Sequence, residues 1–221
     1  PTRGVSGWIE SGIGPEFDMD IDSTLKSLEH AHSLGSEIFF IDAGWYVAPD
    51  REEDWWKQCG DWRFNHERYP AGIEQVREAA HEKGMLFGMW MDADRIGPGS
   101  EVWKAHEDWR ATNYTGRRTG SGLLNLAADE VCAWMEKEIR YLLDNSRLDM
   151  FRLDYNIGAQ DAVAYNERDG YLENTFLRYY DNVYAVYSRL RRDYPNVIFE
   201  SCAGGGGRTD LGMVSNFTHS W

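Results

Sequence analysis

Short apolar runs that end in a polar or acidic residue recur along this chain, and helical patterns lie between them. The runs cover residues 38–41, 85–91, 123–124, 150–153 and 197–199, and they lead to Asp42, Asp92, Asn125, Asp154 and Glu200. Apolar runs of this kind are typical of strands that are buried on both faces of a parallel sheet. The chain is therefore expected to form a parallel sheet.

Helical patterns fill the intervals at residues 22–34, 72–83, 129–143 and 173–193. Asp22 and Ser23 are expected to cap the first helix, and Gly35 and Gly84 are expected to end the first two. This alternation of strands and helices predicts a parallel sheet wrapped by helices, either doubly wound or closed into a barrel.

Two features favour the barrel. Polar residues follow many strands rather than one switch point, and no G-x-G-x-x-G follows the first strand. With residues 7–9 as a first strand and 216–220 as the start of a last one, we count about seven strands, fewer than a closed (β/α)8 barrel has. We expect an α/β fold of the TIM-barrel type, incomplete in this chain, as a single catalytic domain over residues 1–221 truncated at its C-terminal end.

Charge and composition exclude several classes of partner. The chain has 37 acidic and 23 basic residues, a net charge of −14 and no basic cluster, which argues against nucleic acid and anionic membranes. No apolar run reaches the roughly 20 residues of a membrane span. Cys59, Cys132 and Cys202 are widely spaced and odd in number, so we expect reduced thiols. The chain starts at Pro1 without Met, so we expect a processed chain or an excerpt that could have lost a leader; the expected thiols and the lack of a signal-peptide pattern in these residues favour a cytoplasmic protein.

Aromatic residues make up 14% of the chain, with 10 Trp, 12 Tyr and 9 Phe. Their flat apolar faces suit the C–H face of a sugar ring, and their polar edges suit hydroxyl groups. Packing in the core is the alternative for most of them.

Arg152, Asp154 and Asn156 alternate, so on a strand they point to one side. A cation two residues before a carboxylate favours its ionised form, as a nucleophile requires. A buried Arg–Asp pair that holds the sheet together explains the stretch equally well.

Four successive glycines follow the strand that ends at Glu200, at residues 204–207. Such a stretch can approach a ligand closely and adopt positive φ. The G-K-[ST] ending of a phosphate-binding loop is absent. A turn that lines a site is favoured over a flexible surface loop.

Two further strand ends combine a carboxylate with an indole. Asp42 and Trp45 offer a hydroxyl acceptor and a pocket wall, although Asp42 could instead cap a helix. Trp90 precedes Asp92 and Asp94, which either shape the strand end or pair with Arg95. The scattered His residues give no metal-binding pattern, so no metal is expected.

Taken in order, these segments resemble glycoside hydrolase family 36, the α-galactosidases of the melibiase clan. The D-D-G-W strand end resembles residues 42–45, F-G-L-W-x-E-P-E resembles 87–94, P-x-S resembles 98–100, and H-x-D-W resembles 106–109. The nucleophile motif K-W-D-x-N resembles residues 152–156. The most specific match is E-x-C-x-x-G-G-G-R-x-D-x-G-M, which resembles residues 200–213.

The resemblance implies a retaining α-glycosidase that hydrolyses terminal α-linked sugars by double displacement, without metal or organic cofactor. Asp154 would be the nucleophile. The implied substrate-binding residues are Asp42, Trp45, Trp90, Asp92, Arg152, Asn156, Glu200, Cys202 and Gly205. The implied partner is a small carbohydrate, and the full-length protein is expected to carry flanking β-rich domains and to form a homo-oligomer.

Retention also requires a general acid/base about 5 Å from the nucleophile. The family has it in a W-x-S-D motif whose Trp aligns with Trp221, so we expect it just past this residue, unless Glu200, Asp92 or Asp94 serves.

Departures from the family pattern concern the substrate. Ala43 removes a hydroxyl acceptor, Arg152 replaces Lys, and Arg117 and Arg118 are the nearest candidates for a substrate-binding Arg. The sugar could be galactose, N-acetylgalactosamine or an arabinopyranose. The alternatives to a glycosidase are a degenerate barrel that only binds a glycan and a metal-dependent barrel hydrolase.

Overall fold

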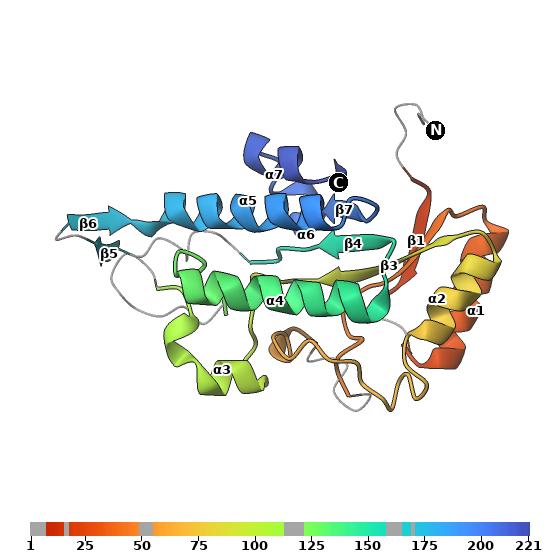
Figure 1. Cartoon of the computed structure of the whole chain (residues 1–221). Coiled ribbons are helices and arrows are strands. Elements are labelled where there is room, and N and C mark those ends of the chain that lie inside the picture. Colours follow the sequence, from red (N-terminus) through yellow and green to blue (C-terminus); the bar gives the residue numbers. More distant parts are fainter. Residues whose placement is uncertain (1–7, 16–17, 49–54, 113–121, 158–164, 169–170) are drawn as a thin grey trace.

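The computed structural model describes residues 8–15, 18–48, 55–112, 122–157, 165–168 and 171–221. Six parallel strands form one curled sheet, a half-barrel, in the order β1-β2-β3-β4-β7-β8 (Figure 1). They are β1 (Glu10–Ile13), β2 (Ile38–Ile41), β3 (Leu86–Met91), β4 (Met150–Leu153), β7 (Ile198–Ser201) and β8 (His219–Ser220). The predicted fold class, an incomplete (β/α) barrel, is confirmed.

Several predicted strand positions were wrong. Leu123 and Leu124 form isolated antiparallel bridges with Arg95 and Arg110 rather than a strand of the sheet. The first strand begins at Glu10 rather than within residues 7–9, of which Gly7 lies outside the described residues. The last begins only at His219, because α7 (Leu211–Asn216) occupies the preceding residues. An antiparallel hairpin, β5 (Tyr165–Arg168) and β6 (Tyr171–Asn174), had not been expected.

Four long helices agree with the sequence patterns: α1 (Ile21–Ser33), α2 (Glu74–Glu82), α4 (Asp129–Ser146) and α5 (Thr175–Asp193). The cap of α1 is Asp20, whose carboxylate accepts the N–H of Ser23 at 2.7 Å, rather than Asp22 or Ser23. Gly35 and Gly84 follow the ends of α1 and α2 with φ of 81° and 71°, as predicted for these positions. Within the described residues, no helix is both long and apolar enough to span a membrane.

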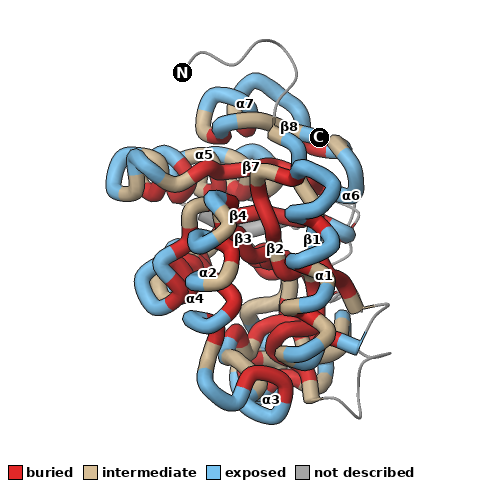
Figure 2. The backbone as a smooth tube through the Cα atoms, turned by 90° about the vertical axis from the view of Figure 1, so that its right-hand side faces the viewer, coloured by how far each residue is buried: buried red, intermediate tan, exposed pale blue. Residues whose placement is uncertain are grey.

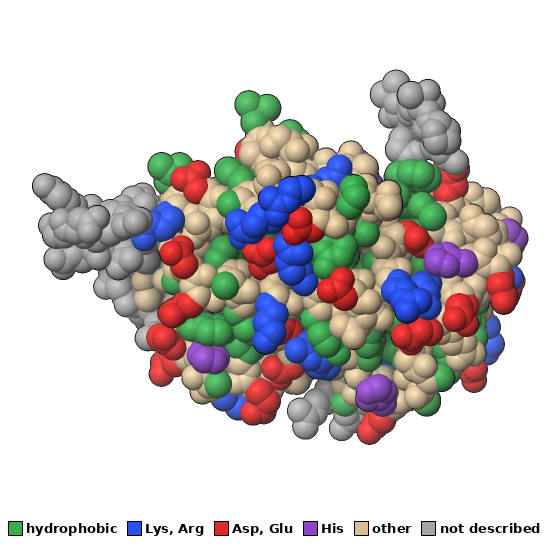
Figure 3. Space-filling view, in the orientation of Figure 1, with side chains coloured by type: hydrophobic (Ala, Val, Ile, Leu, Met, Phe, Trp, Pro, Cys, Tyr) green, Lys and Arg blue, Asp and Glu red, His purple; other side chains and the backbone are tan. Residues whose placement is uncertain are grey.

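Among the short helices of the described residues are α3 (Glu101–Ala105), η2 (Glu107–Trp109) and α6 (Ala203–Gly206). Helices α4 and α5 run side by side along one side of the sheet (Figure 1). Charged side chains of both signs are interspersed on their outer face (Figure 3). There Glu136 of α4 receives hydrogen bonds from Arg140 at 2.7 Å and from Arg189 of α5 at 2.5 Å, which links the two helices.

The buried strands form the centre of the molecule (Figure 2). Strand register places Ile41, Met89, Phe151 and Phe199 in one row across β2, β3, β4 and β7. Phe199 contacts Phe217 with ring centroids 6.5 Å apart, and Phe217 contacts Tyr187 of α5 at 4.7 Å, so this row faces the helices. Its burial supplies the apolar layer between sheet and helices.

A second register row is polar. Trp90, Arg152, Glu200 and His219 are neighbours across β3, β4, β7 and β8. Because side chains alternate along a strand, this row points to the face opposite the apolar row, which is the interior of the half-barrel. On the interior face this polar row lies at the C-terminal ends of the strands, whereas Ile38, Met150 and Ile198, on the same face nearer the strand starts, form a buried apolar cluster.

Candidate functional site

Asp154 lies directly after β4, where its backbone N–H still donates to the carbonyl of Met91 at 2.9 Å. Its carboxylate accepts four hydrogen bonds. Oδ2 accepts from Trp90 Nε1 at 2.9 Å and from Asn156 Nδ2 at 2.6 Å, and Oδ1 accepts from the backbone N–H groups of Tyr155 and Gly204, both at 2.8 Å. The structure thus brings Trp90, Asn156 and the glycine turn together on Asp154.

These hydrogen bonds set the charge of Asp154. Burial, at 8% exposure, acts to raise its pKa. The donors Gly204, Trp90, Tyr155 and Asn156 outweigh burial and hold the pKa below the ordinary value of 3.8. The sequence interpretation had given this effect to Arg152, but the structure gives it to hydrogen bonds. Asp154 is an ionised carboxylate at neutral pH, as a nucleophile must be.

The glycine turn, residues 203–207, supplies one of these donors because its backbone is left-handed. Ala203, Gly204, Gly205 and Gly206 have φ of 51°, 61°, 86° and 91°. A Cβ on Gly205 would meet nothing within 4 Å, so backbone conformation rather than lack of space calls for glycine there. Cys202, before the turn, donates its N–H to the carbonyl of Leu153 at 2.8 Å, which places the turn beside Asp154.

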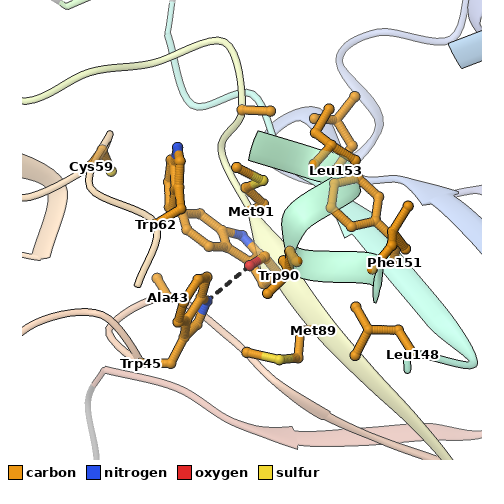
Figure 4. Close-up of a cluster of buried hydrophobic side chains, with 14 of the residues drawn as sticks. Ala43, Trp45, Cys59, Trp62, Met89, Trp90, Met91, Leu148, Phe151 and Leu153 are labelled. Atoms are coloured by element: carbon orange, nitrogen blue, oxygen red, sulfur yellow. Dashed lines mark hydrogen bonds between the residues drawn. The ribbon is translucent and has the colours of Figure 1, made fainter. Parts of the chain in front are cut away.

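Two buried indoles support the strand ends. Trp90 is 1% exposed and Trp45 is 0% exposed, and Trp45 Nε1 donates to the carbonyl of Trp90 at 3.0 Å (Figure 4). Trp55 packs against the Trp90 ring at right angles, with centroids 5.5 Å apart. Trp45 had been expected to form a pocket wall; in this structure it lies beneath Trp90 and supports it.

Arg152 is held by the carboxylate of Glu200 on the adjacent strand β7 and by those of Glu10 on β1 and Asp42 after β2, which the curl of the sheet brings across the interior. Its Nε donates to Glu200, its Nη2 donates to Glu10 Oε2 at 2.7 Å, and its Nη1 lies 3.7 Å from Asp42 Oδ2. The guanidinium stacks on the ring of Phe40, 3.6 Å from its centroid. Of the residues expected to bind sugar hydroxyls, Arg152 and Glu200 are thus engaged with each other.

His219 and Glu10 complete this network and had been missed in the sequence. His219 Nε2 lies 2.6 Å from Glu200 Oε2 and 3.1 Å from Glu10 Oε1. Burial opposes both charges, yet His219 and Arg152 lower the pKa of Glu200 to about 2, and Glu10 and Glu200 raise the pKa of His219 to about 9. No sequence signal marked the pair, because Glu10 and His219 lie 209 positions apart.

The charged network lines a cavity of about 530 Å³ in the half-barrel interior. The lining residues are Trp8, Glu10, Ser11, Gly12, Phe40, Arg152, Glu200, His219 and Trp221. Oxygen and nitrogen atoms of Glu10, Glu200 and His219 lie within 4.8 Å of one another, close enough to hold a metal ion. The guanidinium of Arg152, bonded to both glutamates, already supplies the cation.

Asp92 and Asp94 have different environments. Asp92 is 0% exposed, and its Oδ2 accepts the N–H of Asn156 at 3.4 Å and lies 3.9 Å from Arg95. Burial raises its pKa to about 8, so it is mainly protonated at neutral pH. Asp94 pairs with Arg208 at 2.7 Å. Of the two carboxylates, only Asp92 lies against the Asp154 segment.

Two other predicted residues lie beside this network: Asp42 near Arg152, and Cys202 near Asp154. Asp42 follows β2 with about a third of its side chain exposed, and its Oδ1 accepts the N–H of Ala43 at 2.7 Å. Cys202 is 8% exposed, and burial beside Asp154 raises its pKa to about 11. It is a thiol at neutral pH and, like Cys59 and Cys132, makes no disulfide. Arg117 and Arg118 lie outside the described residues.

Comparison with known proteins decides the family. The melibiase family matches residues 8–221, nearly the whole chain. The chain belongs to the melibiase family. α-Galactosidase AgaA of Geobacillus stearothermophilus is 28% identical over 214 residues, which are 93% of this chain and 28% of that protein. α-Galactosidase 2 of Pediococcus pentosaceus is 30% identical over 203 residues, 88% of this chain and 27% of that protein.

Solved melibiase relatives share the fold. An α-galactosidase from Lactobacillus brevis superposes with a TM-score of 0.85 at 30% identity, over 97% of this chain and 29% of that one. AgaA, a member of glycoside hydrolase family 36, has the same TM-score at 26% identity, over 97% of this chain and 30% of that one. The resemblance to this family is therefore confirmed. This chain spans less than a third of the length of these relatives.

Proposed function

We propose that these 221 residues form the part of an α-galactosidase-like retaining glycosidase that carries the nucleophile, Asp154. The observation that supports this most strongly is the four-fold hydrogen bonding of its carboxylate, which keeps it charged at the end of a barrel strand. Barrel enzymes place their chemistry at this end of the strands.

The reaction would proceed in two displacements. Asp154 attacks the anomeric carbon, the bond to the leaving-group oxygen breaks, and a glycosyl ester forms. Water then attacks the same carbon, releases the carboxylate and gives the sugar with retained configuration. The N–H groups of Gly204 and Trp90 would hold the carboxylate at the angle required for attack.

The general acid/base is proposed to lie outside these residues. Asp94 is bonded to Arg208 and Tyr179, and Glu200 is bonded to Arg152 and His219. Asp92 is protonated at neutral pH but completely buried, so it does not reach a leaving group. Of the three carboxylates considered from the sequence, Asp94 and Glu200 are therefore engaged in ion pairs, and Asp92 is enclosed.

The proposed substrate is a small glycoside with a terminal α-linked galactose-like sugar. AgaA variants have been crystallised with stachyose, raffinose and 1-deoxygalactonojirimycin. In this chain Asp42 and Asn156 would bind hydroxyls, with Trp90, Cys202 and Gly205 against the ring. Ala43 and Arg152 replace two hydrophilic residues of the family pattern, so the identity of the sugar must be measured.

The test uses the full-length protein and aryl α-galactoside, α-N-acetylgalactosaminide and arabinopyranoside substrates, with the product anomer followed by NMR. We expect hydrolysis of at least one substrate with retention, and loss of activity in Asp154→Asn. Asp149→Asn is the matched control, because Asp149 lies at the opposite end of β4, bonded to His81 and the N–H of Phe87. Inversion of configuration, or full activity of Asp154→Asn, would refute the proposal.

A further inference from the structure

The turn that donates to Asp154 needs an anchor of its own. Gly204, Gly205 and Gly207 are exposed and have no side chain to pack. Glycine also has the largest conformational freedom of any residue, so the order of this segment depends on its ends and on its own backbone hydrogen bonds, from Gly206 to Cys202 and from Gly207 to Ala203. Its first end is held by the hydrogen bond from Cys202 to Leu153. What holds the second end fixes how the rest of the turn lies, and so helps to keep the Gly204 N–H on the carboxylate.

Arg208 lies at that second end and is 4% exposed. Its Nη1 donates to Asp94 Oδ2 at 2.7 Å, and Asp94 also accepts the hydroxyl of Tyr179 at 2.5 Å. The guanidinium lies 4.0 Å from the centroid of the Tyr155 ring, and Tyr155 follows the nucleophile directly. Arg208 therefore contacts both the end of β3 and the segment of Asp154.

We propose that Arg208 is a positioning residue: by joining the glycine turn to Asp94 and Tyr155, it holds the Gly204 N–H on the Asp154 carboxylate. This inference rests on the proposed function, since it concerns the same nucleophile.

A purely stabilising role accounts poorly for the Arg208–Asp94 ion pair. Within the described part of the chain, Arg208 Nε and Nη2 and Asp94 Oδ1 are buried without a hydrogen-bond partner. Buried ion pairs with unsatisfied donors and acceptors add little or nothing to stability, whereas in some proteins such pairs fix the geometry of the segments they join. The pair is better explained by the orientation that it imposes on the turn.

The experiment measures the pH dependence of kcat/KM for Arg208→Met in the full-length protein. If the Gly204 hydrogen bond is loosened, the acidic limb, which reports ionisation of Asp154, moves up by about one pH unit. We also expect kcat to fall by roughly tenfold, with a smaller change in KM. Arg208→Lys should restore part of the shift, because Lys keeps the charge but not the planar fork.

Arg208→Met leaves the buried Asp94 charge unpaired, so the double variant Arg208→Met/Asp94→Asn is measured beside it. It has no unpaired charge and should fold, yet it should show the same limb shift. Arg189→Met is the matched control, because Arg189 pairs with Glu136 on the outer helices. An unmoved acidic limb in the folded double variant overturns the inference.

Labelling by a 5-fluorinated α-galactosyl fluoride separates the two proposals. If the unaltered protein is labelled on Asp154 and the Arg208 variants behave like it in pH dependence, only the positioning role fails. If the unaltered protein is not labelled at all, the proposed function fails, and the positioning role fails with it.

Discussion

Replacing Trp90 by Phe should change the ionisation of Asp154 by a predictable amount. The substitution removes the Nε1–H that donates to Asp154 Oδ2 at 2.9 Å and leaves three donors in place. A hydrogen bond to a charged group contributes about 1.5–3 kcal/mol. Water entering the space left by the indole offsets part of the loss, so we take about 1.4 kcal/mol, which corresponds to about one pKa unit.

The assay is the pH profile of kcat/KM in the full-length protein. We expect the acidic limb of Trp90→Phe to lie about one pH unit higher than that of the unaltered protein. The position of the limb, rather than the size of kcat/KM, is the readout, because Trp90 is also expected to line the sugar site.

Trp45→Phe is the matched control. It removes an indole N–H of the same kind from Trp45, the ring beside Trp90, but this N–H donates to the carbonyl of Trp90 and not to a carboxylate. We expect it to lower stability without moving the limb. Equal limb positions in all three proteins would refute the account of how Asp154 is kept charged.

Three further predictions concern stability. Asp20→Ala removes the cap on the Ser23 N–H and should cost about 1 kcal/mol, lowering Tm by roughly 2–4 °C in thermal unfolding; Asp22→Ala should change Tm much less, and equal losses would refute the cap assignment. His219 has its pKa raised to about 9, so its contribution is full below about 6.5 and lost as pH rises through 9. Urea unfolding at pH 6 and 9.5 should therefore show a larger loss for the unaltered protein than for His219→Gln, and parallel losses would contradict the pairing. Asp92, with its pKa raised to about 8, opposes folding increasingly as pH rises from 3.8 to 8. Asp92→Asn should unfold at higher urea concentration than the unaltered protein at pH 8, and a lower midpoint there would show that the charged form is favoured in the fold.

Local patterns in the sequence predicted much of the architecture. The strand at 38–41 and the strand at 150–153 have the predicted bounds, because each is a four-residue apolar or mostly apolar run that ends at a carboxylate, a length and pattern that fit a buried strand. Leu123 and Leu124 followed a similar pattern, but two residues are too few to extend the sheet, and they form bridges to Arg95 and Arg110 instead.

The site was predictable where its parts are close in sequence. Asp154 and Asn156 share a strand end, and the run of glycines indicates a backbone with positive φ. The partners that cross the sheet were not predictable from local spacing. The Arg208–Asp94 bond spans 114 positions, and the Glu10–Arg152 bond spans 142, so the curl of the half-barrel, not any motif, brings them together.

Arg152 was expected to keep Asp154 ionised, but in the structure its side chain pairs with other carboxylates. Sequence spacing placed it nearest Asp154, but Glu200 on the adjacent strand β7 and Glu10 on β1, across the half-barrel, offer two carboxylates at hydrogen-bond distance. A guanidinium with a planar set of donors binds such carboxylates directly, and Asp154 is left to neutral donors.

The most direct measurement of the central claim is the site of covalent labelling. The full-length protein is treated with the fluorinated glycosyl fluoride, digested, and the labelled peptide is sequenced by mass spectrometry. The account predicts one sugar ester on Asp154, formed at a rate that falls in Trp90→Phe and disappears in Asp154→Asn. A label on Asp92, Asp94 or Glu200 in a protein whose Asp154 remains unmodified would contradict it.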